Sequence, residues 1–394
     1  MPNQNLFSEF APVSKADWLA RIEKDLKGRP ISELTWELPS LLIDPFAHAE
    51  DFAELPESIA HKTSNTWEIG EDIEVFNSDF KAANKQALNA LMGGASAINF
   101  IFDNYPSENQ LITLIENIEL DFISIHFTEK TNTTNPLDFL KTLHSTAINQ
   151  GKNPQSSLRG TKQLRGSVSY NPLIEQQKNG HEAVEVIQWT SQNLSQFKVL
   201  SIDAMQFFKG SENAVEELTQ TLVNANNCIN LLKNKGLNIE NINHFIKFNF
   251  NIGISYFIEI AKLRAFKLLW ANVLYAHGIT ASTHSDSKKL APIIYAYISP
   301  ETQVEDVHNN KIRATTQAMS AVLGGVEMLT IAPSDALNSE TSDFSRRIAR
   351  NVQHLLQMES YLDRVADPAA GSFYIEKLTT QIAETVWQRF QDKA

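Results

Sequence analysis

One local pattern occurs twice, once in the first third of the chain and once in the last. NKQALNALMGGASAINFIF covers Asn84 to Phe102, and ATTQAMSAVLGGVEMLTIA covers Ala314 to Ala332. In both, apolar residues at helical spacing lead into a Gly-Gly pair, and a run suited to a strand follows directly. Glycine suits a helix end that needs positive φ, and the run that follows suits a buried strand. A chain that repeats this unit is predicted to form a parallel α/β array.

Eight segments have the pattern of buried strands. They are Thr66–Phe76, Ala97–Phe102, Phe122–Phe127, Gly166–Tyr170, Phe197–Asp203, Phe245–Ile252, Pro292–Ile298 and Val326–Ile331. Helical spacing follows most of them, at Asn84–Met92, Glu108–Asn117, Asp138–Asn149, Ser211–Asn234, Tyr256–Tyr275, His308–Leu323 and Asp343–Ser360. Eight alternating units predict an α/β fold, a (β/α)8 TIM barrel, rather than an open sheet. A doubly wound sheet would need a Gly-rich turn after its first strand, and Trp67–Asp72 is not one.

Residues 1–62 differ from the barrel, which we assign to residues 63–394. They predict a helical and extended arm, with a helix at Lys15–Leu26 and a proline-punctuated stretch, TWELPSLLIDPF, after it. The arm is too short for a core of its own, so it packs either on its own barrel or on a partner subunit. Both alternatives stay open. If the arm is a subunit interface, its large apolar side chains are the candidates, namely Trp18, Trp36 and Phe46.

Charge and composition exclude several classes of function. Lys and Arg number 34 against 46 Asp and Glu, and the formal net charge of −12 argues against a nucleic-acid partner. The single cysteine, Cys228, excludes an intramolecular disulfide and is interpreted as a small buried hydrophobe. The sequence shows neither a signal-peptide pattern nor an apolar run of ~18 residues. We expect a cytoplasmic protein with no membrane partner.

The strong catalytic motifs are absent, because the sequence has no Walker loop, nucleophile elbow, HExxH or dinucleotide fingerprint. His126 lies late in the third strand, a catalytic zone of barrels, but a lone imidazole there is more often a hydrogen-bonded core residue. His284 and Asp286 share a polar loop and are interpreted as solvated. His308 stands at a helix start, where it is expected to cap the helix.

A basic cluster precedes the fourth strand. SLRGTKQLRGSVSY carries Arg159, Lys162 and Arg165 and has the charge to hold an acyl-CoA phosphate. An ordinary solvated loop explains it equally well. Its place before a strand puts it on the structural rather than the catalytic face of a barrel.

The C-terminal run SDFSRRIARNVQHLLQMESYLDRVADPAAGSFYIEKLT, Ser342 to Thr379, resembles the barrel of the adenosylcobalamin-dependent methylmalonyl-CoA mutase family. HNNKIRATTQAMSAVLGG, FIEIAKLRAFKLLW and LFSEFAPVSKADWLARIEKDLKG add to the resemblance, which covers most of the chain. The phrases WEIGEDI and NKQALNALMGGASAINF are similar to the small, or beta, subunit of that family. The resemblance implies an isomerase that interconverts methylmalonyl-CoA and succinyl-CoA. It places a corrinoid on the C-terminal face of the barrel and the CoA tail along the barrel axis.

Measured against that family, the chain lacks the expected active-site residues. Ala204 stands where the family has an imidazole after its fifth strand, and an alanine methyl cannot donate a proton. Counting back from Asn309, the family's His and Gln of the seventh strand fall on Ile294 and Ala296. Ala336 stands at the ribose-binding glutamate. We therefore predict no catalytic, cofactor-binding or metal residues, and a barrel axis packed by Ile294 and Ile298 among others.

The sequence reaches Ala394 without the family's corrinoid module, so we expect no C-terminal cobalamin-binding domain. The leading hypothesis is a non-catalytic small subunit that binds no cofactor itself and pairs with the large, or alpha, subunit, which holds adenosylcobalamin. The first alternative is a catalytic acyl-CoA mutase barrel that uses a separate cobalamin-binding chain. The second, a free acyl-CoA binder, depends on Arg159, Lys162 and Arg165 alone.

Overall fold

The computed structural model describes residues 11, 13–54, 62–131, 134–150, 164–173, 180–279, 290–338 and 341–393. Nine parallel strand segments form one sheet, in the order β7-β6-β5-β4-β3-β11-β10-β9-β8. Their bounds are β3 Glu68–Glu74, β4 Ala97–Phe102, β5 Ser124–Glu129, β6 Arg165–Val168, β7 Phe197–Lys198, β8 Leu200–Asp203, β9 Ile246–Asn251, β10 Ile294–Ile298 and β11 Met328–Ile331. Each of the eight predicted strands is present, the fifth as two segments.

The two segments of the fifth strand close the sheet into a barrel. β7 pairs with β6 and β8 pairs with β9, and only Val199 separates the two segments. Beyond the last β6 pairing, the Ser201 N–H donates to the Tyr170 carbonyl oxygen at 2.8 Å. The fold is therefore the predicted (β/α)8 TIM barrel.

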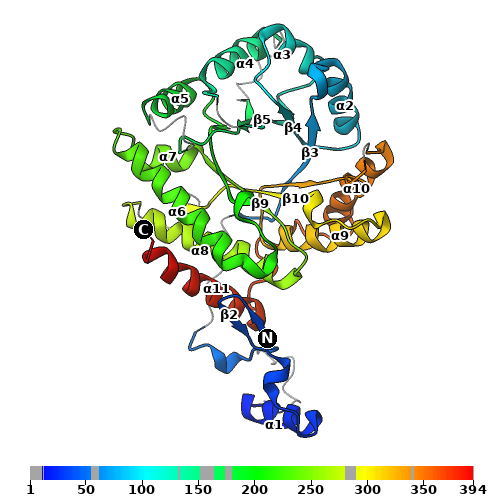
Figure 1. The fold of residues 1–394 in the computed structure, drawn as a ribbon, viewed down its shortest axis with the longest axis vertical. Coiled ribbons are helices and arrows are strands. Elements are labelled where there is room, and N and C mark those ends of the chain that lie inside the picture. Colours follow the sequence, from blue (N-terminus) through cyan, green and yellow to red (C-terminus); the bar gives the residue numbers. More distant parts are fainter. Residues whose placement is uncertain are drawn as a thin grey trace, which may run out of the picture.

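Helices surround the barrel (Figure 1). Their bounds are α2 Phe80–Met92, α3 Glu108–Leu114, α4 Leu137–Gln150, α5 Gly180–Asn193, α6 Ala214–Lys233, α7 Ile239–Phe245, α8 Tyr256–Ala276, α9 Val307–Leu323, α10 Asp343–Met358 and α11 Phe373–Gln391. Helices α5, α7 and α11 are not among the helices predicted from the sequence. The buried face of α5 includes the β-branched residues Val186, Ile187 and Thr190, which have a lower helix propensity than straight-chain residues.

Every strand presents an apolar face to the helices and a more polar face to the barrel axis. On β9, Phe248 and Phe250 contact Phe266 of α8, with ring centroids 4.7 and 4.9 Å apart. The alternate residues Lys247 and Asn249 turn inward, and the Asn249 amide donates to Ser201 Oγ at 3.0 Å. The sequence pattern IKFNFN thus separates the outer core from the interior.

The predicted orientation of β10 is wrong. Ile294, Ala296 and Ile298 belong to the core under the helices, whereas Tyr295 joins an interior cluster flanked by Tyr297. Strand side chains alternate between faces, so a one-residue slip in counting back along the chain exchanges the two faces. Ile294 and Ala296 therefore do not occupy the interior positions assigned to them from the resemblance.

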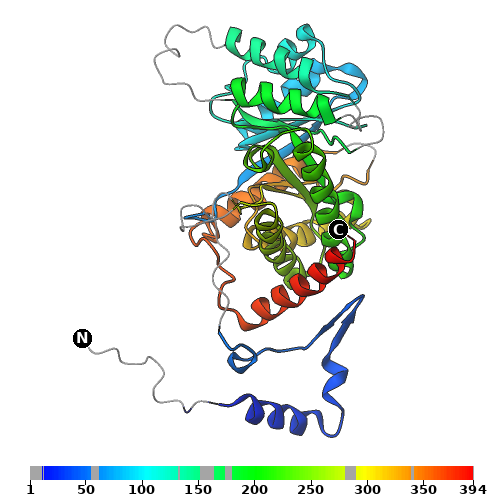
Figure 2. The same cartoon turned by 90° about the vertical axis from the view of Figure 1, so that its left-hand side faces the viewer.

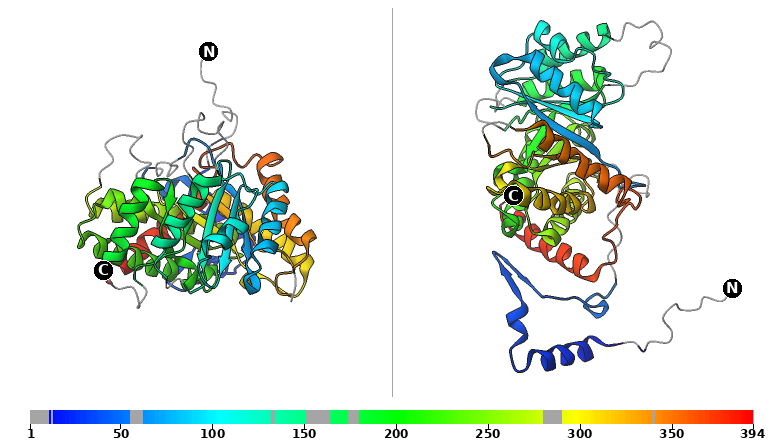
Figure 3. Two further views of the ribbon diagram at one scale, coloured as in Figure 1. Left: turned by 90° about the horizontal axis from the view of Figure 1, so that it is seen from above. Right: turned by 90° about the vertical axis from the view of Figure 1, so that its right-hand side faces the viewer.

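The arm lies beyond α11, on the opposite side of that helix from the barrel (Figures 2 and 3). It consists of α1 Lys15–Leu26, a hairpin of β1 Trp36–Leu38 and β2 Leu41–Ile43, and short 3₁₀ turns. Leu41 and Ile43 are buried, and β2 contacts α11. The Lys377 ammonium and the Asp44 carboxylate form an ion pair at 2.9 Å. Helix α1 is anchored within the arm, since the Trp18 ring lies 4.5 Å from that of Phe46.

Helix α8 carries buried cations that join separate elements. Lys262 lies between Glu217 of α6 and Glu259 of its own helix, at 3.0 and 2.8 Å, and all three side chains are fully buried. Arg264, also buried, pairs with Asp367 and, at 2.7 Å, with Glu376 of α11. These ion pairs connect α8 to α6 and α11, and α11 is the helix that the arm contacts.

Candidate active site

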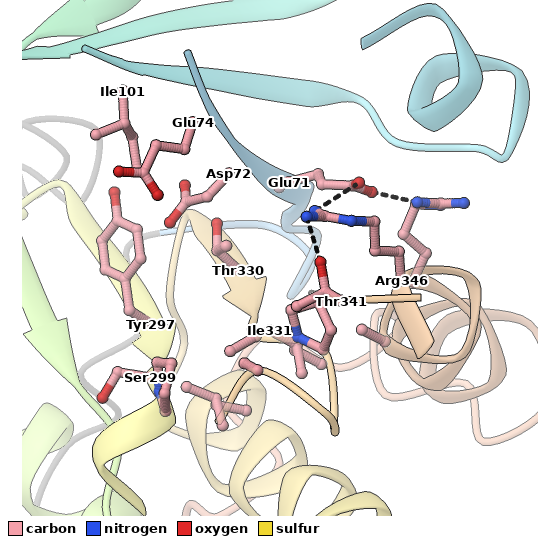
Figure 4. A pocket seen from close by; sticks show the side chains of 18 of the residues that line it. Glu71, Asp72, Glu74, Ile101, Tyr297, Ser299, Thr330, Ile331, Thr341 and Arg346 are labelled. Atoms are coloured by element: carbon pink, nitrogen blue, oxygen red, sulfur yellow. Dashed lines mark hydrogen bonds and ion pairs between the residues drawn. The ribbon is translucent and has the colours of Figure 1, made fainter. Parts of the chain in front are cut away.

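A cavity of about 790 Å³ opens at the C-terminal ends of β3, β10 and β11, the face of a barrel where active sites lie. Figure 4 shows it from close by, with the first turns of α10 on one side and β10 on the other. Much of its wall is apolar, and the polar side chains gather at two ends. The apolar lining residues are Phe76, Ile101, Met205, Ile298, Pro300, Ile331, Ala332, Pro333, Ala336 and Ala349.

One end, which we name the acidic pole, consists of Asp72, Tyr297 and Thr330 (Figure 4). The Asp72 carboxylate accepts a hydrogen bond from the Asn99 amide at 2.9 Å. Burial raises the pKa of Asp72 to about 6, although the Asn99 hydrogen bond and the Lys247 charge act in the opposite direction. Thr330 is 4% exposed, and its hydroxyl has no hydrogen-bond partner. The pole therefore offers a carboxylate and an unused hydroxyl to the cavity.

The other end, the basic pole, consists of Glu71, Arg346 and Arg350. Glu71 forms an ion pair with Arg350 and lies 3.8 Å from Arg346. Arg346 also donates to the Thr341 hydroxyl at 2.6 Å. Arg350 is 8% exposed, and its Nε has no hydrogen-bond partner. Two guanidinium groups share one carboxylate here, so this pole keeps an excess positive charge.

Below the cavity, side chains bridge the barrel axis. β5 and β10 lie four positions apart in the sheet order, so they form opposite walls of the eight-stranded barrel. The rings of His126 on β5 and Tyr295 on β10 nevertheless meet, with centroids 5.2 Å apart. Lys247 lies over the Tyr295 ring, 5.0 Å from its centroid. All three are nearly inaccessible to solvent.

The environment of these interior groups favours their neutral forms. Burial lowers the pKa of the Lys247 ammonium to about 8, with Asp203 and Asp72 opposing the shift. Burial also lowers the pKa of the His126 imidazole well below its usual range, and the Lys247 charge adds to the effect. His126 Nδ1 forms a hydrogen bond of 2.8 Å with Ser167 Oγ, while its Nε2 has no partner. His126 is thus a hydrogen-bonded interior residue, as expected from the sequence.

The other residues singled out in the sequence do not converge on the cavity. Ala204 begins a short 3₁₀ helix after β8 and is fully buried. Arg165 lies at the start of β6, 3.7 Å from Glu68. Asp306, not His308, caps α9, because its carboxylate accepts from the His308 N–H at 2.8 Å. Cys228 is buried in α6, and burial raises the pKa of its thiol to about 12. Outside the described residues lie Arg159, Lys162, His284 and Asp286.

Among the described residues, the lining of the cavity offers no imidazole or thiolate as a metal ligand, because none of the residues that line it is a histidine or a cysteine. Across the described ranges, no group of three His, Cys, Asp or Glu side chains is placed to hold a metal ion. None of the described helices has the length and apolar character needed to cross a bilayer.

Asp72 is expected to make stability depend on pH. An unperturbed aspartate ionises near 3.8, whereas burial raises the pKa of Asp72 in the folded chain to about 6. Between these values the unfolded chain binds fewer protons than the folded chain, so the free energy of unfolding falls as pH rises. Asp72→Asn should remove this dependence of the free energy of unfolding on pH, as measured by urea denaturation between about pH 4 and pH 6.5. Asp138→Asn, at a side chain 99% exposed, should keep the wild-type slope.

The chain is similar to proteins of one family. The sequence profile of the family described as methylmalonyl-CoA mutase matches residues 106–393. The methylmalonyl-CoA mutase small subunit of Porphyromonas gingivalis is 32% identical over 98% of this chain and 64% of its own length. The methylmalonyl-CoA mutase of Escherichia coli is 35% identical over 69% of this chain and 37% of its own length. The methylmalonyl-CoA mutase large subunit of Propionibacterium freudenreichii is 31% identical over 63% of this chain and 34% of its own length. The chain thus spans less than two thirds of the length of these relatives.

Proposed function

The chain belongs to the methylmalonyl-CoA mutase family, and from this premise we propose that it is a small, non-catalytic subunit of the mutase. Its partner is a large subunit of the same family, which binds adenosylcobalamin and interconverts methylmalonyl-CoA and succinyl-CoA. The role of this chain is to stabilise and position that partner. Names of relatives support the pairing, because both small and large subunits occur among them.

The observation that carries the proposal is the bridge across the barrel axis. The resemblance implies that a catalytic subunit threads the CoA tail along this axis. Here His126 and Tyr295, from opposite walls, are in ring contact at 5.2 Å and lie across that path. A pantetheine chain would have to displace both buried rings and the Lys247 ammonium packed on Tyr295.

The cavity at the C-terminal face adds independent support. Its acidic pole presents Asp72, whose charge opposes a substrate carboxylate at that end. Two positions where the resemblance implies polar groups carry methyl groups, namely the buried Ala204 after β8 and Ala336 in the wall of the cavity. The lining histidine that general-acid chemistry at a thioester would need is missing from the described residues.

Activity measurements test the proposal. The purified chain, supplied with adenosylcobalamin and methylmalonyl-CoA, is expected to form no succinyl-CoA. A mixture with the large subunit should be active and should elute as a complex in size-exclusion chromatography. Turnover by the isolated chain would refute the non-catalytic role, and turnover only after adding a separate cobalamin-binding chain would favour a catalytic barrel instead.

The arm is the proposed contact with the large subunit. Trp18 and Phe46 are half-buried against each other, so of the three aromatic candidates Trp36 is the exposed one, at 45%. Leu42, on the paired strand opposite Glu37, is 58% exposed and adds apolar surface on the other face of the hairpin. Apolar and aromatic side chains at the centre of an interface carry most of its binding energy.

Trp36→Ser combined with Leu42→Ser is expected to weaken binding to the large subunit by about tenfold or more. Interferometry with immobilised large subunit measures the change. Ile148→Ser is the matched control, because Ile148 is similarly exposed, at 57%, but lies on α4, far from the arm (Figure 1). Equal affinity of the double variant and the wild type would show that the interface lies elsewhere.

A further inference from the structure

The charges around the C-terminal cavity are separated rather than mixed. Near the acidic pole, the cavity is lined by the carboxylates of Asp72 and Glu74. Glu74 forms an ion pair with Lys130, whereas Asp72 accepts a hydrogen bond from the neutral Asn99 amide. At the basic pole, Arg346 and Arg350 share the single carboxylate of Glu71, which leaves one positive charge in excess. The cavity therefore has opposite charge at its two ends, and Figure 4 shows Asp72 and Arg346 on opposite sides of it.

Two buried polar groups of the lining lack partners within the chain. Thr330, 4% exposed, has a free hydroxyl at the acidic pole. Arg350 Nε also lacks a partner, but this side of the guanidinium packs against Gly93 at the end of α2. Unsatisfied buried polar atoms are uncommon in native proteins, because each one costs the desolvation of the group. The unused Thr330 hydroxyl therefore points to a ligand that bonds at the acidic pole, and the Arg346 guanidinium offers a charge at the other end of the same cavity.

We propose that this cavity binds an amino acid with an apolar side chain. Its ammonium group lies at Asp72, with Thr330 and Tyr297 beside it, and its carboxylate lies at Arg346. Its side chain packs against the apolar wall, which includes Phe76 and Ile101. The volume of about 790 Å³ is in the range of small-molecule sites and accommodates such a ligand together with water.

Ligands with a single charge fit the cavity less well. A carboxylate without an amine can bind Arg346 but leaves Asp72 without a cation. An amine without a carboxylate satisfies Asp72 but leaves the excess positive charge of the basic pole unpaired. Only a molecule that carries both charges neutralises both poles, and both interactions are strengthened because the cavity lies in a medium of low polarity.

Binding is measured on the isolated chain, so the result does not depend on the proposed partner role. Leucine, isoleucine, valine, methionine and phenylalanine are tested by isothermal titration calorimetry. At least one is expected to bind with one-to-one stoichiometry. If leucine binds, 3-methylbutylamine, which lacks its carboxylate, and 4-methylpentanoate, which lacks its amine, should each bind about tenfold more weakly or worse. The corresponding pair of analogues is used for any other binder. Absence of binding by all five amino acids, or an analogue that binds as well as its parent, would overturn the proposal.

Variants locate the site. Asp72→Asn should weaken binding of the amino acid about tenfold or more while leaving the affinity for its amine-free analogue unchanged. Arg346→Gln should have the complementary effect, weakening the amino acid but not the carboxylate-free analogue. Asp138→Asn, on the exposed surface of α4, is the control and should bind as the wild type does. If either pole variant bound both the amino acid and its analogue like the wild type, the assignment of that pole would be wrong. The two analogues test the charge requirement on the wild-type protein even if a variant fails to fold.

Discussion

Replacing Lys262 by methionine is expected to lower the free energy of unfolding by about 3–5 kcal/mol. The change removes the one ammonium that lies between Glu217 and Glu259 and leaves two carboxylates that are inaccessible to solvent. Burial already raises the pKa of Glu217 to about 7, although Lys262 opposes the shift. Without Lys262 both carboxyl groups must take up protons or the helices must separate. The loss, measured by urea denaturation, should therefore be smaller at acidic than at alkaline pH.

Two controls separate the missing ion pair from a general effect of the substitution. Lys85→Met, at an exposed position of α2, should change stability by no more than about 0.5 kcal/mol. Adding Glu217→Gln and Glu259→Gln to Lys262→Met should recover much of the loss, because neutral amides replace the uncompensated charges. A triple variant as unstable as Lys262→Met would mean that packing around Lys262, rather than charge, decides the outcome.

Replacing Gly166 by alanine should destabilise the barrel by more than about 4 kcal/mol. Gly166 lies in β6 with φ of +148°, and an added methyl would overlap the carbonyl oxygen of Ile125 on the neighbouring strand. The same methyl would lie 2.6 Å from the Ile125 carbonyl carbon and 2.9 Å from Phe197 Cε2. Because backbone atoms of β5 cannot move without breaking their pairing with β4, the strain cannot relax locally. Thermal denaturation and amide exchange of β5 measure the effect.

Gly278→Ala is the matched control for this substitution. Gly278 also has positive φ, +101°, but no atom lies within 4 Å of the position of its added methyl. The Gly278→Ala variant should lose only about 1–3 kcal/mol of stability, which is the cost of placing an alanine in this backbone conformation. Similar losses at the two glycines would show that backbone conformation, not the clash with β5, explains the effect at Gly166.

The barrel was predictable from the sequence because its strands and most of its helices carry their own local signals. Buried parallel strands are continuous apolar runs, and the Gly-Gly stops mark where two helices end. Helix α5 gave a weaker signal, because the β-branched Val186, Ile187 and Thr190 have low helix propensity and its packing against the barrel compensates for this. The observed strand boundaries also differ from the predicted ones, since the fifth strand is interrupted at Val199. Its two segments pair with different neighbours where the barrel closes, and no local sequence pattern indicates such a break.

The interior of the barrel was less predictable, for a reason that β10 illustrates. Tyr295 and Tyr297 alternate with Ile294 and Ala296, and either pair has enough apolar surface to face the helices. The choice depends on what the neighbouring strands present, and Lys247 of β9 and His126 of β5 need the tyrosine face inside. The sequence IKFNFN of β9 indicates the orientation of its strand more clearly. The helices outside the barrel require an apolar face, and only the face with the phenylalanines is apolar. Applying that requirement to every strand would have found the polar interior.

The two poles of the cavity could not have been found by matching the chain to catalytic motifs. Asp72 and Arg346 are far apart in sequence, and neither occurs in a recognised catalytic pattern. They come together because β3 and α10 meet at the C-terminal end of the barrel. Counting positions against a family predicts lost residues such as Ala336, but it does not reveal polar side chains that other elements bring to the cavity.

The ring contact between His126 and Tyr295 also governs how molecules move through the barrel. The two buried rings lie across the interior below the cavity at the C-terminal end and obstruct a route out along the axis. A molecule in that cavity must leave by the mouth through which it entered. A protein that docks over the mouth without touching the molecule slows entry and departure by the same factor. Occupancy at equilibrium then stays constant while residence time grows, so docking would turn a rapidly exchanging site into a kinetic trap.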